Sequence, residues 1–207
     1  MIIGLTGNSG CGKSTVADIM REEYGAFIID ADKIAHEVLL KNHAAYIEVV
    51  VEFGEDILNG DGEIDRRKLG RIVFANNRQR ERLTEITHKY ILEEMLTQLE
   101  LAREKYPHVI MDAPLLIEAG LHKESDMVWL VYATPELRCA RIVSRDALTE
   151  AEAYKRMASQ TSHDELEKYA DVVIDNSRGP EGLQGEVRRV MSDKNFHKAT
   201  KKTIRNK

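Results

Sequence analysis

Cysteine, proline and long apolar runs are all scarce in this sequence of 207 residues. The two cysteines, Cys11 and Cys139, are too few for a disulfide framework and favour a reducing compartment. The four prolines leave long stretches free to form helix. No apolar run is long enough to predict a membrane-spanning helix, and the start, MIIGLTGNSG, lacks the basic segment of a signal peptide. We therefore expect a cytoplasmic protein with no membrane partner.

Charge of one sign is not in large excess either. The 30 Lys and Arg residues and 35 Asp and Glu residues give a formal net charge of −5, so no nucleic-acid partner is expected. The exception is the basic tail, residues 194–207, which carries six Lys or Arg and no acid. Such a tail could bind nucleic acid or a membrane, but a solvated chain end is the simpler interpretation.

Five short runs of apolar or β-branched residues predict strands that are buried on both faces. They are Ile2–Thr6, Ala26–Ile29, His108–Asp112, Met127–Tyr132 and Asp171–Ile174. Helical patterns separate them, which predicts an α/β fold of three layers around a five-stranded parallel sheet. Helix starts are expected after Asp65, after the pair Thr134-Pro135, and after Thr149, where Glu152 would complete a capping box.

Nearly eighty residues separate the second predicted strand from the third, far more than one crossover helix needs. We interpret this stretch as a helical insertion. Insertions at the carboxyl edge of a parallel sheet usually build a substrate site.

The strongest motif follows the first predicted strand. The run Gly7-Asn8-Ser9-Gly10-Cys11-Gly12-Lys13-Ser14 matches the phosphate-binding pattern G-x-x-x-x-G-K-[ST] in full, and a helix is predicted from about Lys13. Glycines let the backbone wrap closely around a phosphate, and the helix N-terminus adds positive partial charge. Lys13 would reach the β- and γ-phosphates, Ser14 would ligate Mg²⁺, and Thr15 could hold the α-phosphate. Cys11 is interpreted as a small filler rather than a nucleophile.

The phosphate loop alone leaves the acceptor of the phosphoryl group open: water, a small molecule, or none in a nucleotide switch. The pattern N-K-x-D of guanine-specific switches is absent, which disfavours a GTPase. Asp30 and Asp32 end the second strand, at the edge where ligands bind. Asp32 could orient an attacking hydroxyl and take its proton, whereas Asp30 could instead cap the next helix. His36, one turn later, could touch the substrate or be a polar surface residue.

Two further sets of residues have competing interpretations. Asp112 ends the third predicted strand and could hold Mg²⁺ through water, or cap the next turn. Arg138, Arg141 and Arg145 recur at spacings of three and four and so share one helical face. They could be a solvated basic face, or guanidiniums that neutralise charge on a phosphoryl group during transfer.

Six blocks occur in the order GLTG-x-x-GCGKSTVA, DADKIAHEV, GEIDRRKLGRIVF, LTEITHKYI, DAPLLIEAGL and EKYADVVIDN. Together they resemble the dephospho-CoA kinase family over residues 3–176. The resemblance implies ATP-dependent phosphorylation of the ribose 3′-hydroxyl of dephospho-CoA, which yields CoA and ADP in the last step of CoA biosynthesis, with Mg²⁺ as cofactor. It also implies a single domain over residues 1–207. Its parts would be a core (1–40, 105–135 and 165–195), a CoA-binding helical insertion (about 40–105) and a lid (about 135–165).

The resemblance also assigns roles to individual residues. Asp32 would be the general base or the residue that positions the 3′-hydroxyl, and Lys13 and Arg141 would join it in catalysis. The ATP-binding residues would be Gly10, Cys11, Gly12, Lys13, Ser14, Thr15 and Asn176. The acceptor-binding residues would be Asp32, His36, Arg66, Phe74, His88, Pro114, Leu115, Leu116 and Glu118.

The sequence departs from the family pattern in three places. The family's GGIGSGKS differs in positions that mainly offer backbone, and a glutamine often found after the fourth strand is absent near Thr134. The family's ITHP reads ITHK, with Lys89 in place of proline. A kinase of the nucleoside monophosphate type and a regulatory P-loop ATPase are the alternative functions. The expected assembly is a monomer or a small homo-oligomer.

Overall fold

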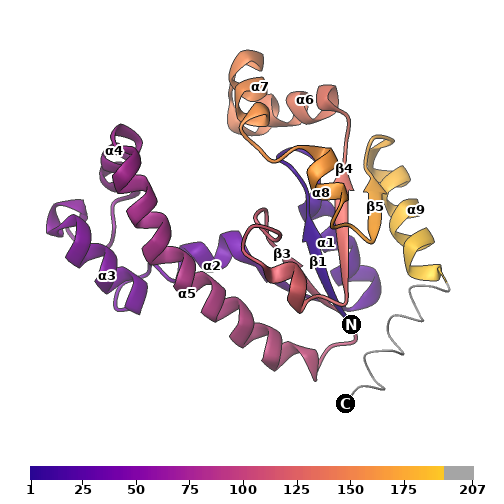
Figure 1. Ribbon diagram of the computed structural model, residues 1–207, viewed down its shortest axis with the longest axis horizontal. Helices are drawn as coiled ribbons and strands as arrows, with labels where there is room; N and C mark the ends of the chain where they lie inside the picture. The colour runs from indigo at the N-terminus through magenta and orange to yellow at the C-terminus, as the bar shows by residue number, and fades with distance from the viewer. Residues whose placement is uncertain (194–207) are drawn as a thin grey trace. The chain divides into compact units, whose positions relative to one another are not determined.

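The computed structural model describes residues 1–193, so the basic tail lies outside the described residues. The chain divides into two compact units (Figure 1). The first contains Met1–Ile29 and the residues from Leu101 onward, and the second contains Asp30–Glu100. Across residues 1–193, no helix has both the length and the apolar character needed to cross a bilayer.

The first unit is organised by a five-stranded sheet with strand order β2-β3-β1-β4-β5. The strands are β1 (Ile2–Thr6), β2 (Phe27–Asp30), β3 (Val109–Asp112), β4 (Met127–Tyr132) and β5 (Val172–Asp175). The prediction of a five-stranded parallel α/β fold is confirmed. β2 begins one residue later than predicted because the Ala26 amide donates to the Met20 carbonyl and so belongs to the end of the preceding helix.

The centre of the sheet defines where a ligand can bind. β1 pairs in parallel with β3 on one side and with β4 on the other, so that Leu5 lies opposite both Asp112 and Trp129. The chain therefore leaves β1 at the point where the strand order reverses. In sheets of this kind, ligands bind at the carboxyl end of the strands beside such a point.

Helices α1 (Lys13–Tyr24) and α9 (Gly179–Ser192) cover one face of the sheet (Figure 1). Their apolar residues, among them Met20 and Val187, form one core with Ile3, Leu5 and Trp129. Successive side chains of a strand point to opposite faces, so Gly4 faces away from this core. A Cβ at Gly4 would lie 2.6 Å from Leu116, which is fully buried on the second face.

The remaining short helices of the first unit are η2 (Leu121–Glu124), α6 (Pro135–Asp146), α7 (Glu150–Ala158) and α8 (His163–Glu167). The predicted cap of α6 is present, since Thr134 accepts from the Leu137 amide. The predicted capping box of Thr149 and Glu152 is also present at the start of α7. α6 and α7 lie side by side and share a small apolar core that includes Ile142.

The second unit is helical, as predicted for this stretch. Its elements are α2 (Ala31–Glu37), α3 (Ala44–Phe53), η1 (Glu55–Ile57), α4 (Arg66–Ala75) and α5 (Asn77–Arg103), the last of which runs past the unit boundary. Asp65 caps α4, as predicted, by accepting from the Arg67 and Lys68 amides. The core of this unit gathers Val49, Ile57, Leu69, Val73 and Ile86.

Candidate active site

The phosphate loop connects β1 to α1, at the strand-order reversal described above. Gly10 and Gly12 have φ angles of 79° and 97°, in the left-handed region that favours glycine. A Cβ would lie 2.7 Å from the Arg138 carbonyl at Gly10, and 2.1 Å from the Asn176 side-chain nitrogen at Gly12. Glycine is therefore required at both positions by conformation and by space.

Asn176, which follows β5, stabilises this loop through a hydrogen bond. It is buried, its Nδ2 donates to the Cys11 carbonyl at 2.8 Å, and its backbone amide donates to the Tyr132 carbonyl at 2.7 Å. The Asn176 side chain, predicted to bind ATP, thus contacts the loop backbone. Its role in ATP binding stays a prediction.

Two of the three predicted arginines reach the loop from α6. Arg141 donates through Nη1 to the Gly10 carbonyl at 3.1 Å and through Nη2 to the Asn176 carbonyl at 3.1 Å. Arg138 donates through Nε to the Ser9 carbonyl at 3.0 Å. The two guanidiniums therefore bring positive charge against the backbone of the phosphate loop.

Arg145, the third arginine at this spacing, does not join them. Its Nε lies 2.7 Å from Asp146 Oδ1, and Arg156 on α7 contacts the other oxygen of the same carboxylate at 2.7 Å. The hydrogen bond from Arg145 lowers the pKa of the Asp146 carboxyl, and Arg156 adds to the effect. Arg145 is thus paired with the adjacent acid, and its role in phosphoryl transfer stays a prediction.

The thiol, ammonium and hydroxyl side chains of the loop differ in exposure. Cys11 is 1% exposed, and burial raises the pKa of its thiol, although Lys13 partly opposes this shift. A neutral, enclosed thiol supports the interpretation of a filler. Lys13 Nζ donates to the Gly7 carbonyl at 2.7 Å, and Ser14 and Thr15 are exposed on the first turn of α1.

Asp112, the predicted magnesium residue, ends β3 beside Leu5 of β1. Its half-buried carboxylate therefore lies at the same edge of the sheet as the start of the phosphate loop. Carboxylate and hydroxyl oxygens, which Asp112 and Ser14 supply, are ligands that Mg²⁺ prefers.

Asp30, the last residue of β2, and Asp32 on α2 have different surroundings. The Asp30 side chain accepts from the Lys33 amide at 3.0 Å and caps α2, as the alternative interpretation predicted. The Asp32 side chain is exposed on the first turn of that helix. The Asp32 carbonyl lies 2.8 Å from Nδ1 of His36, one turn later. Of the two carboxylates, that of Asp32 is therefore the better placed to meet a substrate.

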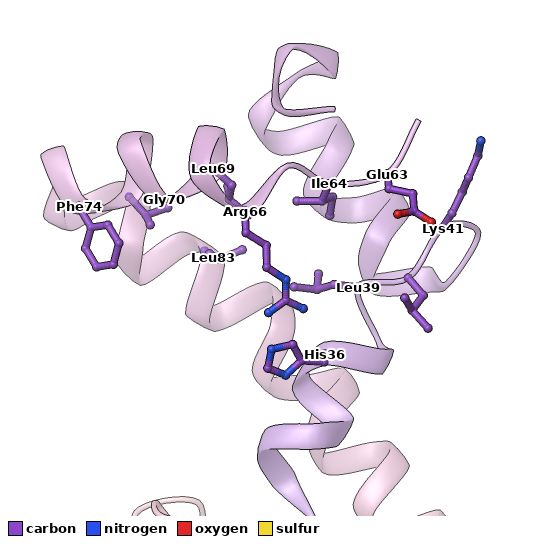
Figure 2. Close-up of a pocket in the computed structure, with 12 residues that line it drawn as sticks. His36, Leu39, Lys41, Glu63, Ile64, Arg66, Leu69, Gly70, Phe74 and Leu83 are labelled. Carbon is purple, nitrogen blue, oxygen red and sulfur yellow. The ribbon is translucent and has the colours of Figure 1, made fainter. Parts of the chain in front are cut away.

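Three predicted acceptor residues line one pocket of the helical unit, with a volume of about 300 Å³ (Figure 2). Arg66, the first residue of α4, points toward the ring of His36. Phe74, at the other end of α4, is 87% exposed. Among the residues described, His88 on α5 is not part of this lining. The pocket combines cationic and apolar groups.

The predicted acceptor segment after β3 has two kinds of residue. Pro114 and Leu115 are exposed, and Glu118 Oε1 accepts from Thr161 Oγ1 at 2.7 Å. Leu116 is fully buried against Gly4 of β1, so its side chain supports the segment from inside the protein. Acceptor binding by this segment stays a prediction.

Comparison with known proteins places these features in a family. A family model described as dephospho-CoA kinase matches residues 1–181. The chain belongs to the dephospho-CoA kinase family. The dephospho-CoA kinase of Geobacter sulfurreducens is 43% identical over 190 residues, which cover 91% of this chain and 96% of that protein. The dephospho-CoA kinase of Aquifex aeolicus is 41% identical over 191 residues, with 92% and 96% covered.

Solved structures agree. A dephospho-CoA kinase from Campylobacter jejuni is 32% identical, with a TM-score of 0.70, and the match covers 92% of this chain and 94% of that one. A Thermus thermophilus crystal structure is also 32% identical, with a TM-score of 0.75 and coverage of 93% and 96%. Shikimate kinase from Acinetobacter baumannii is 18% identical, with a TM-score of 0.53 and coverage of 92% and 90%, and shares the fold.

Membership of the dephospho-CoA kinase family confirms the predicted family and the prediction of a kinase. Sequence reasoning missed Gln160, between α7 and α8. Its Oε1 accepts from the Ser9 amide at 3.2 Å and from Arg138 Nη2 at 3.1 Å. No sequence signal pairs a phosphate-loop serine with a glutamine 151 residues later. Lys41 and Leu39, which line the pocket in Figure 2, were also missed.

Proposed function

We propose that this protein transfers the γ-phosphoryl group of ATP to the ribose 3′-hydroxyl of dephospho-CoA, giving CoA and ADP. The observation that carries the proposal is a complete phosphate loop, fixed at the strand-order reversal, in a chain of the dephospho-CoA kinase family. The match to that family favours this acceptor over nucleoside monophosphates, and favours transfer over a nucleotide switch.

The nucleotide side of the reaction would use the loop and α6. Backbone amides between Gly10 and Thr15 would receive the phosphates, helped by the positive end of α1. Lys13 would leave the Gly7 carbonyl to reach the β- and γ-phosphates. Arg141, which contacts the loop carbonyls, would add positive charge where negative charge develops.

The acceptor side would use the helical unit. Asp32 would orient the 3′-hydroxyl and take its proton while the new oxygen–phosphorus bond forms and the bond to the β-phosphate oxygen breaks. Dephospho-CoA carries a diphosphate and a long, partly apolar arm. Arg66 and His36 suit the former, and the apolar side chains around Phe74 suit the latter.

Magnesium fits the residues at the sheet edge. The Ser14 hydroxyl would ligate Mg²⁺ directly, and Asp112 would do so through water. When bound, the ion would neutralise charge on the phosphates during transfer. Within residues 1–193, no group of three or more His, Cys, Asp or Glu side chains gathers as a metal site. Substrate phosphates and water would therefore supply most of the ligands.

The cellular setting is also part of the proposal. Cys11 and Cys139 are both buried and form no disulfide, which suits a reducing compartment. We therefore propose that the protein acts in the cytoplasm, as a monomer or a small homo-oligomer. A sedimentation measurement on the full chain would test the assembly.

An acceptor screen tests the function. ADP release is measured with ATP and Mg²⁺ in the presence of dephospho-CoA, AMP, UMP or adenosine, and with no acceptor. We expect rapid release with dephospho-CoA only, and mass spectrometry should find one added phosphate on the 3′-oxygen. Faster turnover with AMP or UMP would replace the proposal with a nucleotide kinase. Turnover that needs no acceptor would replace it with an ATPase.

A further inference from the structure

The segment between α7 and α8 returns from the predicted lid and contacts the phosphate loop at Ser9. Gln160 makes two hydrogen bonds there with the two ends of its amide. Its Oε1 accepts from the Ser9 backbone amide at 3.2 Å, and its Nε2 donates to Ser9 Oγ at 3.1 Å. Both the backbone and the side chain of Ser9 are therefore fixed by one residue.

Arg138 contacts both Gln160 and Ser9. Its Nη2 donates to Gln160 Oε1 at 3.1 Å while its Nε donates to the Ser9 carbonyl at 3.0 Å. All three residues are half-buried, which strengthens their hydrogen bonds relative to bonds in water. Gln160 thus orients both a loop amide and a guanidinium.

The neighbouring residue extends the contact in two directions. The Thr161 carbonyl accepts from Asn8 Nδ2 at 3.0 Å, and Thr161 Oγ1 donates to Glu118 Oε1 at 2.7 Å. Residues 160–161 therefore join the phosphate loop to the segment after β3. In the proposed function, that segment belongs to the acceptor side.

A glycine-rich loop needs hydrogen bonds of this kind to hold its backbone in one conformation. Gly10 and Gly12 leave the backbone free to adopt many conformations, yet transfer requires amides that are already aligned with the phosphates. Asn176, which follows β5, and Arg141 of α6 fix residues 10–11. The first half of the loop receives its contacts from Gln160, Thr161 and Arg138.

We propose that Gln160 is a positioning residue for phosphoryl transfer. It aligns the Ser9 amide and Arg138, and it attaches the end of the predicted lid to the phosphate loop so that water is kept from the γ-phosphate. The inference rests on the proposed function for its acceptor. Loss of Gln160 should therefore lower the rate of transfer and raise ATP hydrolysis relative to transfer.

Gln160→Met tests this inference, because it keeps the length of the side chain but removes its hydrogen bonds. We expect kcat/KM for ATP to fall about 10-fold and the ratio of acceptor-independent hydrolysis to transfer to rise about 10-fold. Gln160→Glu keeps the acceptor for Ser9 and Arg138, and should return both values to within about threefold of the wild type. Ser9→Ala should add little to Gln160→Met, since Gln160→Met already removes the one bond that the serine side chain makes with Gln160.

Gln98→Met is the matched control. Gln98 lies on α5 and bonds Glu94 at 2.8 Å, outside the proposed machinery, so wild-type kinetics are expected. An unchanged hydrolysis ratio in Gln160→Met, with normal transfer to dephospho-CoA by the wild type, would overturn the inference but not the function. If Gln160→Met fails to fold, the same ratio in Gln160→Leu, which also lacks the hydrogen-bonding atoms, decides, with a rise of at least about twofold required.

The proposed function can fail separately. A wild-type protein that phosphorylates none of the acceptors would refute it. The affinity of Gln160→Met for ATP, measured by calorimetry, would then decide on Gln160 alone. An affinity about 10-fold weaker than that of the wild type supports the positioning role, and an equal affinity refutes it.

Discussion

The phosphate loop and the acceptor pocket are built in different ways. Around the loop, side chains from α6, from the residue after β5 and from the segment before α8 donate to backbone carbonyls or accept from backbone amides, in half-buried or buried positions. Half of the residues that line the pocket in Figure 2 are exposed, among them the long side chains of Arg66 and Phe74. The loop is therefore preorganised, whereas the pocket can adapt to the acceptor that it binds.

The difference has a physical reason. A phosphate is recognised by backbone amides. Because glycines allow a backbone many conformations, other contacts must fix the direction of these amides before the phosphate binds. A long acceptor such as dephospho-CoA is recognised by side chains, which can change rotamer on binding while the backbone stays in place. Substitutions near the loop should therefore change kcat, and substitutions in the pocket should change mainly the KM of the acceptor.

The largest effect should come from the residue that would meet the reacting hydroxyl. Asp32→Asn removes the proposed base without changing the size of the side chain. We expect kcat to fall by about 10²- to 10⁴-fold at an unchanged melting temperature. Asp30→Asn is the matched control, because asparagine still caps α2, and its kcat should stay within about threefold of the wild type. Near-normal turnover in Asp32→Asn would remove Asp32 from the mechanism.

Lys13→Ala should have the next largest effect. The ammonium is the one full charge that the motif itself brings to the transferring phosphoryl group, so kcat should fall by about 10²- to 10³-fold with the fold intact. Lys33→Ala is the control, since Lys33 is exposed on α2 and lies 3.7 Å from Glu37. Steady-state kinetics and circular dichroism measure both. A change confined to the KM of dephospho-CoA would contradict the expectation that loop substitutions act on kcat.

Phe74→Ala tests the expectation that substitutions in the acceptor pocket change mainly the KM of the acceptor. Phe74 is 87% exposed on α4, so its removal should leave the melting temperature unchanged. If the ring packs on the acceptor, the KM of dephospho-CoA should rise about 10-fold while kcat changes less than about twofold. Val51→Ala, on α3 and 81% exposed, is the matched control with no expected effect. A loss of kcat instead of KM would contradict a purely binding role.

The sequence predicted the fold almost to the residue because each element carries its own local signal. Apolar runs such as Met127–Tyr132 predicted strands, and Asp65, Thr134 and Thr149 predicted helix starts, since their caps depend on amides two or three residues away. The phosphate loop was likewise recognised from a local signal, since its motif is one continuous run of residues. The second unit was predicted only as a helical insertion, without the arrangement of its helices. Three side chains that line its pocket, those of His36, Arg66 and Phe74, were nevertheless expected at an acceptor site from the family resemblance.

What the sequence did not predict depends on contacts between distant segments. Arg138, Arg141 and Arg145 look equivalent by spacing, but the carboxylate of Asp146 takes only the last. Leu116 looks like its exposed neighbour Leu115, yet the missing side chain of Gly4 makes room for it in the core. Gln160 has no local signal at all. The side chains that arrange this site are thus less predictable than those of its motif.

A substitution of Cys11 should have the smallest effect. Because Cys11 is buried within the phosphate loop, it tests whether the interior of the loop is closed. Burial raises the pKa of its thiol, so the thiol stays protonated at neutral pH, and the reactive thiolate appears only above the ordinary pKa of the group. In a Cys139→Ser background, alkylation of Cys11 by iodoacetamide, followed by mass spectrometry, should be slow at neutral pH and faster at alkaline pH.

Cys11→Ala is the corresponding variant, and it separates a filler from a nucleophile. The backbone amide and carbonyl that contact Asn8 and Asn176 remain in the variant, and only a small side chain is lost from the core. We therefore expect kcat within about threefold of the wild type and a modest decrease in melting temperature. Rapid alkylation near pH 7, or a loss of kcat as large as that of Lys13→Ala, would mean that the interior of the loop is open and that its preorganisation is weaker than its hydrogen bonds indicate.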